Sequence, residues 1–163
     1  MKPRLLVTYA TRAGSTREVA AIIGDGLTQR GFAVDVTSVK ANPHVEDYQA
    51  ILIGSAVRMG QWLPEAVEWI KTNQQALQRG PVALFTVHMH NTGDDAQSRA
   101  NREAYLSAIR PLLHPVDAVF FSGKIDPTHL SLLERLLVRA VKASVGDARD
   151  WDSIGDWAQT VPV

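Results

Sequence analysis

The sequence predicts an α/β fold in which helices cover both faces of a doubly wound, five-stranded parallel sheet. Two predicted strands, residues 50–53 and 82–87, are nearly continuous apolar runs, as strands buried on both faces are. Segments with helical spacing of apolar residues separate the strands, so strands and helices alternate along the chain. A length of 163 residues and a hydrophobic content of 45% suit a single domain with a substantial core.

The elements follow from hydrophobic periodicity and from glycine and proline punctuation. Strands are expected at about residues 5–7, 32–39, 50–53, 82–87 and 116–122. Helices are expected from Ser15 through Leu27, from Pro64 through Leu77, and around Ala100, Tyr105, Ile109 and Leu112. An extra helix is expected at about 127–145, and a last one from Asp150, a good cap, through Ala158. There are no repeats and no low-complexity tracts, so we expect one domain over residues 1–163.

The strongest functional signal lies in residues 4–17. An apolar run ends there at a hydroxyl-rich loop with one glycine, and Ser15 then opens a helix. Ser15 and Glu18 have the spacing of a capping box. Backbone N–H groups and the helix dipole attract an anion to such an N-terminus, where Gly14 lets the backbone wrap closely. We interpret this loop as the cradle of a phosphate monoester, to which three hydroxyls contribute: Thr11, Ser15 and Thr16.

A well-capped turn without a ligand is the alternative. Arg12 and Arg17 weigh against it, because cations are unfavourable near a helix N-terminus unless an anion is bound. Other phosphate loops fit poorly, since a Walker loop and a dinucleotide fingerprint both need further glycines. A cysteine phosphatase is excluded because the chain has no cysteine.

What is left resembles the flavodoxin superfamily, whose first loop is rich in Thr and Ser, contains a glycine and ends in Thr. Residues 7–18 are similar to the opening of one branch, the flavodoxin-type menaquinone-dependent protoporphyrinogen IX dehydrogenases, and residues 53–60 and 146–151 agree. The resemblance spans nearly the whole chain but none of these motifs specifies a substrate. Five strands with their helices then point to the flavodoxin-like order 2-1-3-4-5, with the ligand at the switch point between strands 1 and 3.

The resemblance implies FMN as the cofactor, with its phosphate in the first loop and its ring between the loops after strands 3 and 4. The cofactor-binding residues we expect are Ala10, Thr11, Arg12, Ala13, Gly14, Ser15 and Thr16 in the first loop, Ser55, Ala56, Val57, Arg58, Met59 and Gly60 in the second, and Val87, His88, Met89 and His90 in the third.

Arg58 is the first candidate for a cation near the reduced ring, which carries negative charge. Met59 or Trp62 would form an apolar wall, and backbone N–H groups of residues 88–90 would contact the pyrimidine edge. The third loop has no Tyr or Trp, which leaves the outer face of the ring open or covered by a side chain of that loop. Ordinary polar loops, with Trp62 packed on the following helix, are the alternative.

The resemblance implies oxidation of protoporphyrinogen IX, with a quinone as electron acceptor. A one-electron carrier with a redox-partner protein and a flavin-free interaction scaffold stay open, so the sequence does not decide between enzyme and carrier. No obligatory acid or base is evident, and catalytic residues are left unassigned. The 17 Lys and Arg equal the 17 Asp and Glu, which argues against a nucleic-acid partner and against the acidic surface typical of flavodoxin shuttles.

No metal site is expected, because His88 and His90 lack a third ligand nearby in sequence. Without a signal peptide or an apolar run near the ~20 residues of a membrane span, we expect a cytoplasmic protein. The extra helix combines an apolar stripe with basic residues. It is either a core helix or a peripheral contact with the inner face of the membrane. The sequence leaves the oligomeric state and the roles of Asp147 and Arg149 undetermined.

Overall fold

A computed structural model of the chain describes residues 2–12, 14–88, 95–122 and 151–163. Its strands are β1 (Arg4–Ala10), β2 (Ala33–Ser38), β3 (Ala50–Arg58), β4 (Gln61–Trp62), β5 (Val82–His88) and β6 (Asp117–Ser122). Its helices are α1 (Ser15–Gln29), α2 (Pro64–Leu77), α3 (Ala96–Ala104) and α5 (Trp151–Thr160), with short 3-10 helices η1 (Val39–Ala41) and η2 (Val45–Asp47). The expected extra helix at 127–145, Asp147, Arg149 and the cap Asp150 lie outside the described residues.

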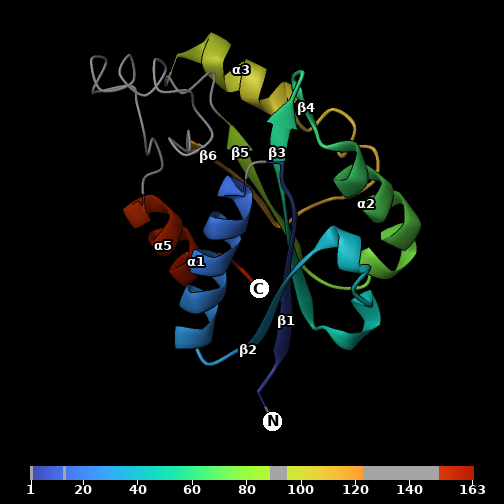
Figure 1. Ribbon diagram of the computed structural model, residues 1–163, viewed down its shortest axis with the longest axis vertical. Coiled ribbons are helices and arrows are strands. Elements are labelled where there is room, and N and C mark those ends of the chain that lie inside the picture. The colour runs from blue at the N-terminus through green and yellow to red at the C-terminus, as the bar shows by residue number, and fades with distance from the viewer. Residues whose placement is uncertain (1, 13, 89–94, 123–150) are drawn as a thin grey trace, which may run out of the picture.

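The strands form the predicted doubly wound parallel sheet in the order β2-β1-β3-β5-β6 (Figure 1). Numbered without β4, this is the expected order 2-1-3-4-5, and the prediction is confirmed. The five parallel strands are those predicted, but the sheet has a sixth strand, because β3 continues to Arg58 and the chain returns antiparallel as β4. Trp62, on β4, is buried, and its burial favours this extra pairing over an open loop.

Helices cover both faces of the sheet, with α1 and α5 on one face and α2 on the other (Figure 1). The two-residue period of β1 divides its side chains between two cores. Leu5 and Val7 pack in the core that includes α1 and α5, whereas Leu6 packs with Trp69 and Ile70 of α2. The apolar run that predicted a strand buried on both faces therefore serves both layers.

The helix predicted around residues 100–112 is shorter than expected. α3 ends at Ala104 and buries none of its residues. Leu106 and Ile109 are buried instead in the following turns, whose amides bond to carbonyls three residues back, as Ile109 N–H does to Leu106 O at 2.9 Å. Pro111 lacks an N–H and disfavours a continued α-helix. Hydrogen bonds from the Ser98 hydroxyl and amide to Asp95, the cap of α3, hold the pKa of that carboxyl below its usual value.

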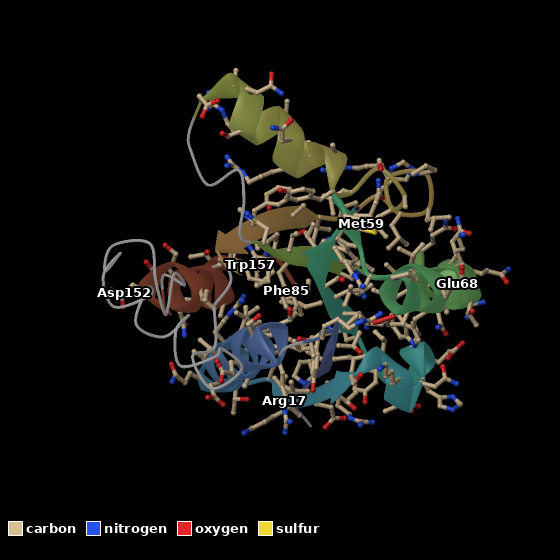
Figure 2. The ribbon with its side chains drawn as sticks, turned by 45° about the horizontal axis from the view of Figure 1, so that its top comes forward. Arg17, Met59, Glu68, Phe85, Asp152 and Trp157 are labelled. Atoms are coloured by element: carbon tan, nitrogen blue, oxygen red, sulfur yellow. The ribbon has the colours of Figure 1, made fainter. Side chains whose placement is uncertain are left out.

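Gly54 in β3 lies directly under Phe85, its partner in β5. A Cβ atom at Gly54 would stand 2.0 Å from the Phe85 ring, so any side chain there must displace the ring. Phe85 in turn contacts the Trp157 ring of α5, with ring centroids 6.3 Å apart (Figure 2). Close packing at the centre of the sheet thus explains why this position is a glycine.

We predict that Gly54→Ala lowers the free energy of unfolding by about 1–3 kcal/mol, the usual range for overpacking a core. Urea unfolding measures the effect, and Phe85→Leu added to Gly54→Ala should recover part of it. Gly155→Ala in α5 is the matched control, because no heavy atom lies within 4 Å of its added Cβ. Equal unfolding midpoints for Gly54→Ala and Gly155→Ala would contradict this account.

Candidate functional site

The candidate site lies at the carboxyl edge of the sheet, where β1 and β3 end side by side (Figure 1). The chain leaves β1 toward α1 on one face, and β3 leads through β4 to α2 on the other. The predicted switch point therefore lies between β1 and β3, which are neighbours in the sheet. In doubly wound sheets, ligands bind in the crevice outside such an edge.

The loop after β1 is arranged around Gly14. Its φ of 88° is left-handed, and its N–H donates to Thr11 Oγ1 at 3.0 Å. Gly14 is the N-cap of α1, and no side chain makes a capping hydrogen bond there in the described structure. The predicted capping box is therefore wrong, because Ser15 lies inside the helix rather than at its cap. Without a side-chain cap, the N-terminus of α1 keeps the character of an anion site.

Thr16 supplies a second sign of a ligand at this N-terminus. Its side chain is fully buried, yet its hydroxyl has no hydrogen-bond partner among the described residues. Leaving a buried hydroxyl unpaired costs about 1–3 kcal/mol. Thr8 Oγ1 and Trp69 Nε1 are also buried without a partner in the described ranges, but Thr16 is the one of these three that lies in the first turn of α1. A bound anion at this position would accept its hydrogen bond.

Arg12 is already engaged in the structure. Its guanidinium makes two hydrogen bonds to the carboxylate of Glu65, and the one from Nη2 to Oε2 is 3.0 Å long. Glu65 lies in the first turn of α2. No sequence pattern marks Glu65 as functional, because the helix dipole is enough to explain an acidic residue in a first helical turn. Only the packing of α2 beside the β1–α1 loop brings the two charges together.

The residues predicted after the third strand form a β-hairpin. Ser55, Ala56, Val57 and Arg58 belong to β3 itself rather than to a loop. The Ser55 hydroxyl is buried, donates to the Ala56 carbonyl at 2.7 Å and accepts from the Leu63 N–H at 3.0 Å. Ser55 therefore holds the base of the hairpin, while Arg58 near its tip is exposed.

Trp62 is 2% exposed, and its indole N–H donates to Thr86 Oγ1 at 2.9 Å. This burial removes Trp62 as a wall for a ligand and anchors β4 to β5. Met59 is the reverse case, since it is 94% exposed at the tip of the hairpin (Figure 2). Of the two apolar candidates for this wall, Met59 is the accessible one.

Met59 and Gly60 form the two-residue turn between β3 and β4, and both have positive φ, 55° and 73°. Turns of this kind favour Asn-Gly, because a methionine in the left-handed region is strained. A strained position that exposes a large apolar side chain is a candidate for contact with a ligand.

We predict that Met59→Asn raises the free energy of unfolding by about 1 kcal/mol, because asparagine tolerates the left-handed conformation. Met59→Leu is the control, since it keeps an unbranched-Cβ apolar side chain with the same backbone strain. Urea unfolding of both variants measures the difference. Equal stability of the Asn and Leu variants would show that the turn is not strained.

The third predicted segment is described only in part. Val87 and His88 belong to β5 and are buried, whereas Met89 and His90 lie outside the described residues, as does Ala13 of the first loop. His88 contacts the rings of Tyr105 and Phe120, with centroids 5.8 and 6.2 Å away. The buried His88 ring therefore packs against the segment after α3 and against β6.

Cavities elsewhere in the described structure do not share the features of this site. Two cavities of about 200 and 350 Å³ lie at the amino ends of β3 and β5 and share Leu77, Gly80 and Val82 in their walls. No buried polar group that lacks a partner in the described structure lines either cavity. The described residues contain no cluster of three His, Asp or Glu side chains suited to a metal, and no described helix is long and apolar enough to cross a bilayer.

Comparison with known proteins agrees with this geometry. The sequence model of the flavodoxin domain matches residues 6–152. The chain belongs to the flavodoxin domain family. Among solved structures, a short-chain flavodoxin associated with a bacterial microcompartment superposes with a TM-score of 0.58 and 16% identity, over 96% of this chain and 95% of that one. This likeness is one of fold.

Curated relatives of this flavodoxin-domain chain share one name. Protoporphyrinogen IX dehydrogenase (quinone) of Escherichia coli K12 is 22% identical over 170 residues, which cover 97% of this chain and 94% of the relative. The enzyme of that name from Leishmania major is 28% identical over 90 residues, which cover 53% of this chain and 39% of the relative. The chain is thus a flavodoxin-like protein close to that branch, as the resemblance of residues 7–18 led us to expect.

Proposed function

We propose that the chain binds one FMN, without a covalent bond, as its redox cofactor. The observation that carries the proposal is the N-terminus of α1, where the left-handed Gly14 stands in place of a side-chain cap and the buried Thr16 hydroxyl has no partner in the part of the chain that the structure describes. Membership of the flavodoxin domain family supports a flavin. The pattern has one helix N-terminus and no second phosphate motif, which favours a mononucleotide over a dinucleotide.

Each group of residues has a distinct task in this proposal. Residues 11–16 hold the phosphate through backbone N–H groups and hydroxyls. The turn Met59-Gly60 and the end of β5 flank the ring, and the exposed Arg58 places positive charge near it. FMN supplies the electron transfer, while the protein binds, orients and tunes it. A cation near the ring favours its reduced, more negative form and raises its reduction potential.

We predict that Thr16→Val weakens FMN binding at least about tenfold, because a hydrogen bond to a charged group is worth about 1.5–3 kcal/mol. The same variant should unfold at an equal or higher urea concentration, since it removes a buried hydroxyl that no described residue pairs with. Thr8→Val is the matched control: it also removes such a hydroxyl, and it should leave FMN affinity unchanged. Fluorescence titration with FMN and with riboflavin, which lacks the phosphate, measures the binding.

Two results would contradict the FMN proposal. One is wild-type protein that is colourless and ignores FMN in the titration, which would favour the flavin-free scaffold. The other is equal affinity for FMN and riboflavin, which would show that the loop holds no phosphate. The double variant Arg12→Glu with Thr16→Ala should abolish FMN binding while its circular dichroism spectrum stays that of a folded protein.

For the reaction we propose oxidation of protoporphyrinogen IX, with electrons passed on to a quinone such as menaquinone. The similarity to the dehydrogenase of Escherichia coli, over 97% of this chain and 94% of that one, supports it. A net charge of 0 also supports it, because a carrier that docks on basic redox proteins is steered by acidic charge. We assign no side chain as acid or base, and hydrogen removal then depends on how the loops orient the substrate against the ring.

An anaerobic experiment distinguishes this dehydrogenase from a one-electron carrier. FMN-loaded protein is mixed with protoporphyrinogen IX, and bleaching of the flavin absorbance is followed before a menaquinone analogue is added. We expect bleaching with the porphyrinogen and recovery with the quinone. Flavin that stays oxidised with the porphyrinogen but is reduced by a flavodoxin reductase would favour the carrier.

A further inference from the structure

The ion pair between Arg12 and Glu65 joins the phosphate loop to α2. The side chains are 43% and 22% exposed, so the carboxylate is the more buried partner. Its position is fixed by the helix start: the Leu63 N–H is held by Ser55 Oγ, and the Ala66 N–H donates to the Leu63 carbonyl at 3.0 Å. The dipole of α2 favours a carboxylate in its first turn. Arg12 is therefore paired with the Glu65 carboxylate, which the start of α2 holds in place.

This pair has little to contribute to folding, because partly exposed ion pairs are weak. The pair matters more for the binding of an anion in the loop, because it occupies donors that the anion could use. A guanidinium carries five N–H donors in a planar fork, and Glu65 occupies two of the nitrogens. A phosphate monoester that binds beside Arg12 must either take the fork from Glu65 or share it with a carboxylate of like charge.

We propose that Glu65 competes with the cofactor phosphate for Arg12 and so sets the affinity of the loop below what its donors could provide. This inference rests on the proposed FMN site and concerns a residue that is not a ligand itself. Glu65 acts through Arg12 and through charge repulsion. At separations of several ångströms near a protein surface, such repulsion amounts to roughly a tenfold change in affinity.

The test is the variant Glu65→Gln, which keeps the size of the side chain and removes its charge. We expect its Kd for FMN to fall about tenfold, as the Coulomb term predicts. Its Kd for riboflavin should not change, because riboflavin has no phosphate. Inorganic phosphate should also compete with FMN at a lower inhibition constant in this variant than in wild type. Glu65→Ala repeats the test with a second neutral residue.

Glu68→Gln is the matched control, because it makes the same change in net charge on the same helix. Glu68 pairs with Lys71 at 3.6 Å and its side chain is 71% exposed, on the outer side of α2 (Figure 2). It should leave the Kd for FMN unchanged. Added to Arg12→Gln, the Glu65→Gln change should tighten FMN binding by less than it does in wild type, because the cation for which the anions compete is gone and only direct charge repulsion remains.

The outcomes separate this inference from the proposed function. If wild type prefers FMN to riboflavin but Glu65→Gln binds FMN no more tightly, competition is refuted. If Glu65→Gln binds FMN more weakly, Glu65 positions Arg12 for the phosphate, which also refutes it. If wild type does not prefer FMN to riboflavin, the proposed phosphate site fails first. A gain for FMN but not for riboflavin, and one that is smaller in the Arg12→Gln background, establishes the competition.

Discussion

The parallel pairing of β1 with β3 is the interaction on which the site depends. Its register runs from Leu5 opposite Ala50 to Ala10 opposite Ser55, so the two strands reach the sheet edge together. The first loop and the hairpin consequently leave the sheet as neighbours, although more than forty residues separate them in sequence. On its other side β3 packs closely against β5, because Gly54 leaves room for the Phe85 ring.

One cation of the first loop is paired with a carboxylate of another element. Arg12 faces Glu65, and the formal net charge of the protein is 0. A helix N-terminus flanked by arginines would by itself hold a dianion strongly. A nearby carboxylate moderates that attraction. The arrangement suits a loop whose affinity for an anion is adjusted by a second element rather than by the loop alone.

The fold and the chemistry of this chain rest on different observations. Membership of the flavodoxin domain family follows from a match over residues 6–152 and agrees with the sheet order. The same architecture serves many functions, and substrates are distinguished by the side chains on the loops beyond the strands. Met59 is an exposed side chain of this kind, on a turn with positive φ beyond the end of β3.

The sequence by itself determined the alternation of strands and helices, the sheet order and the position of the first loop, because these depend on local periodicity and on a topology rule. Tertiary structure decided the rest. Gly14, not Ser15, is the N-cap of α1, since only glycine readily takes the left-handed conformation that precedes this helix. Trp62 lies in the core rather than at the site, because burying its indole with a hydrogen bond to Thr86 is more favourable than exposing it to solvent. Glu65 lies at the site because α2 packs beside the first loop. No local sequence pattern encodes this contact, because its two residues are far apart in the chain.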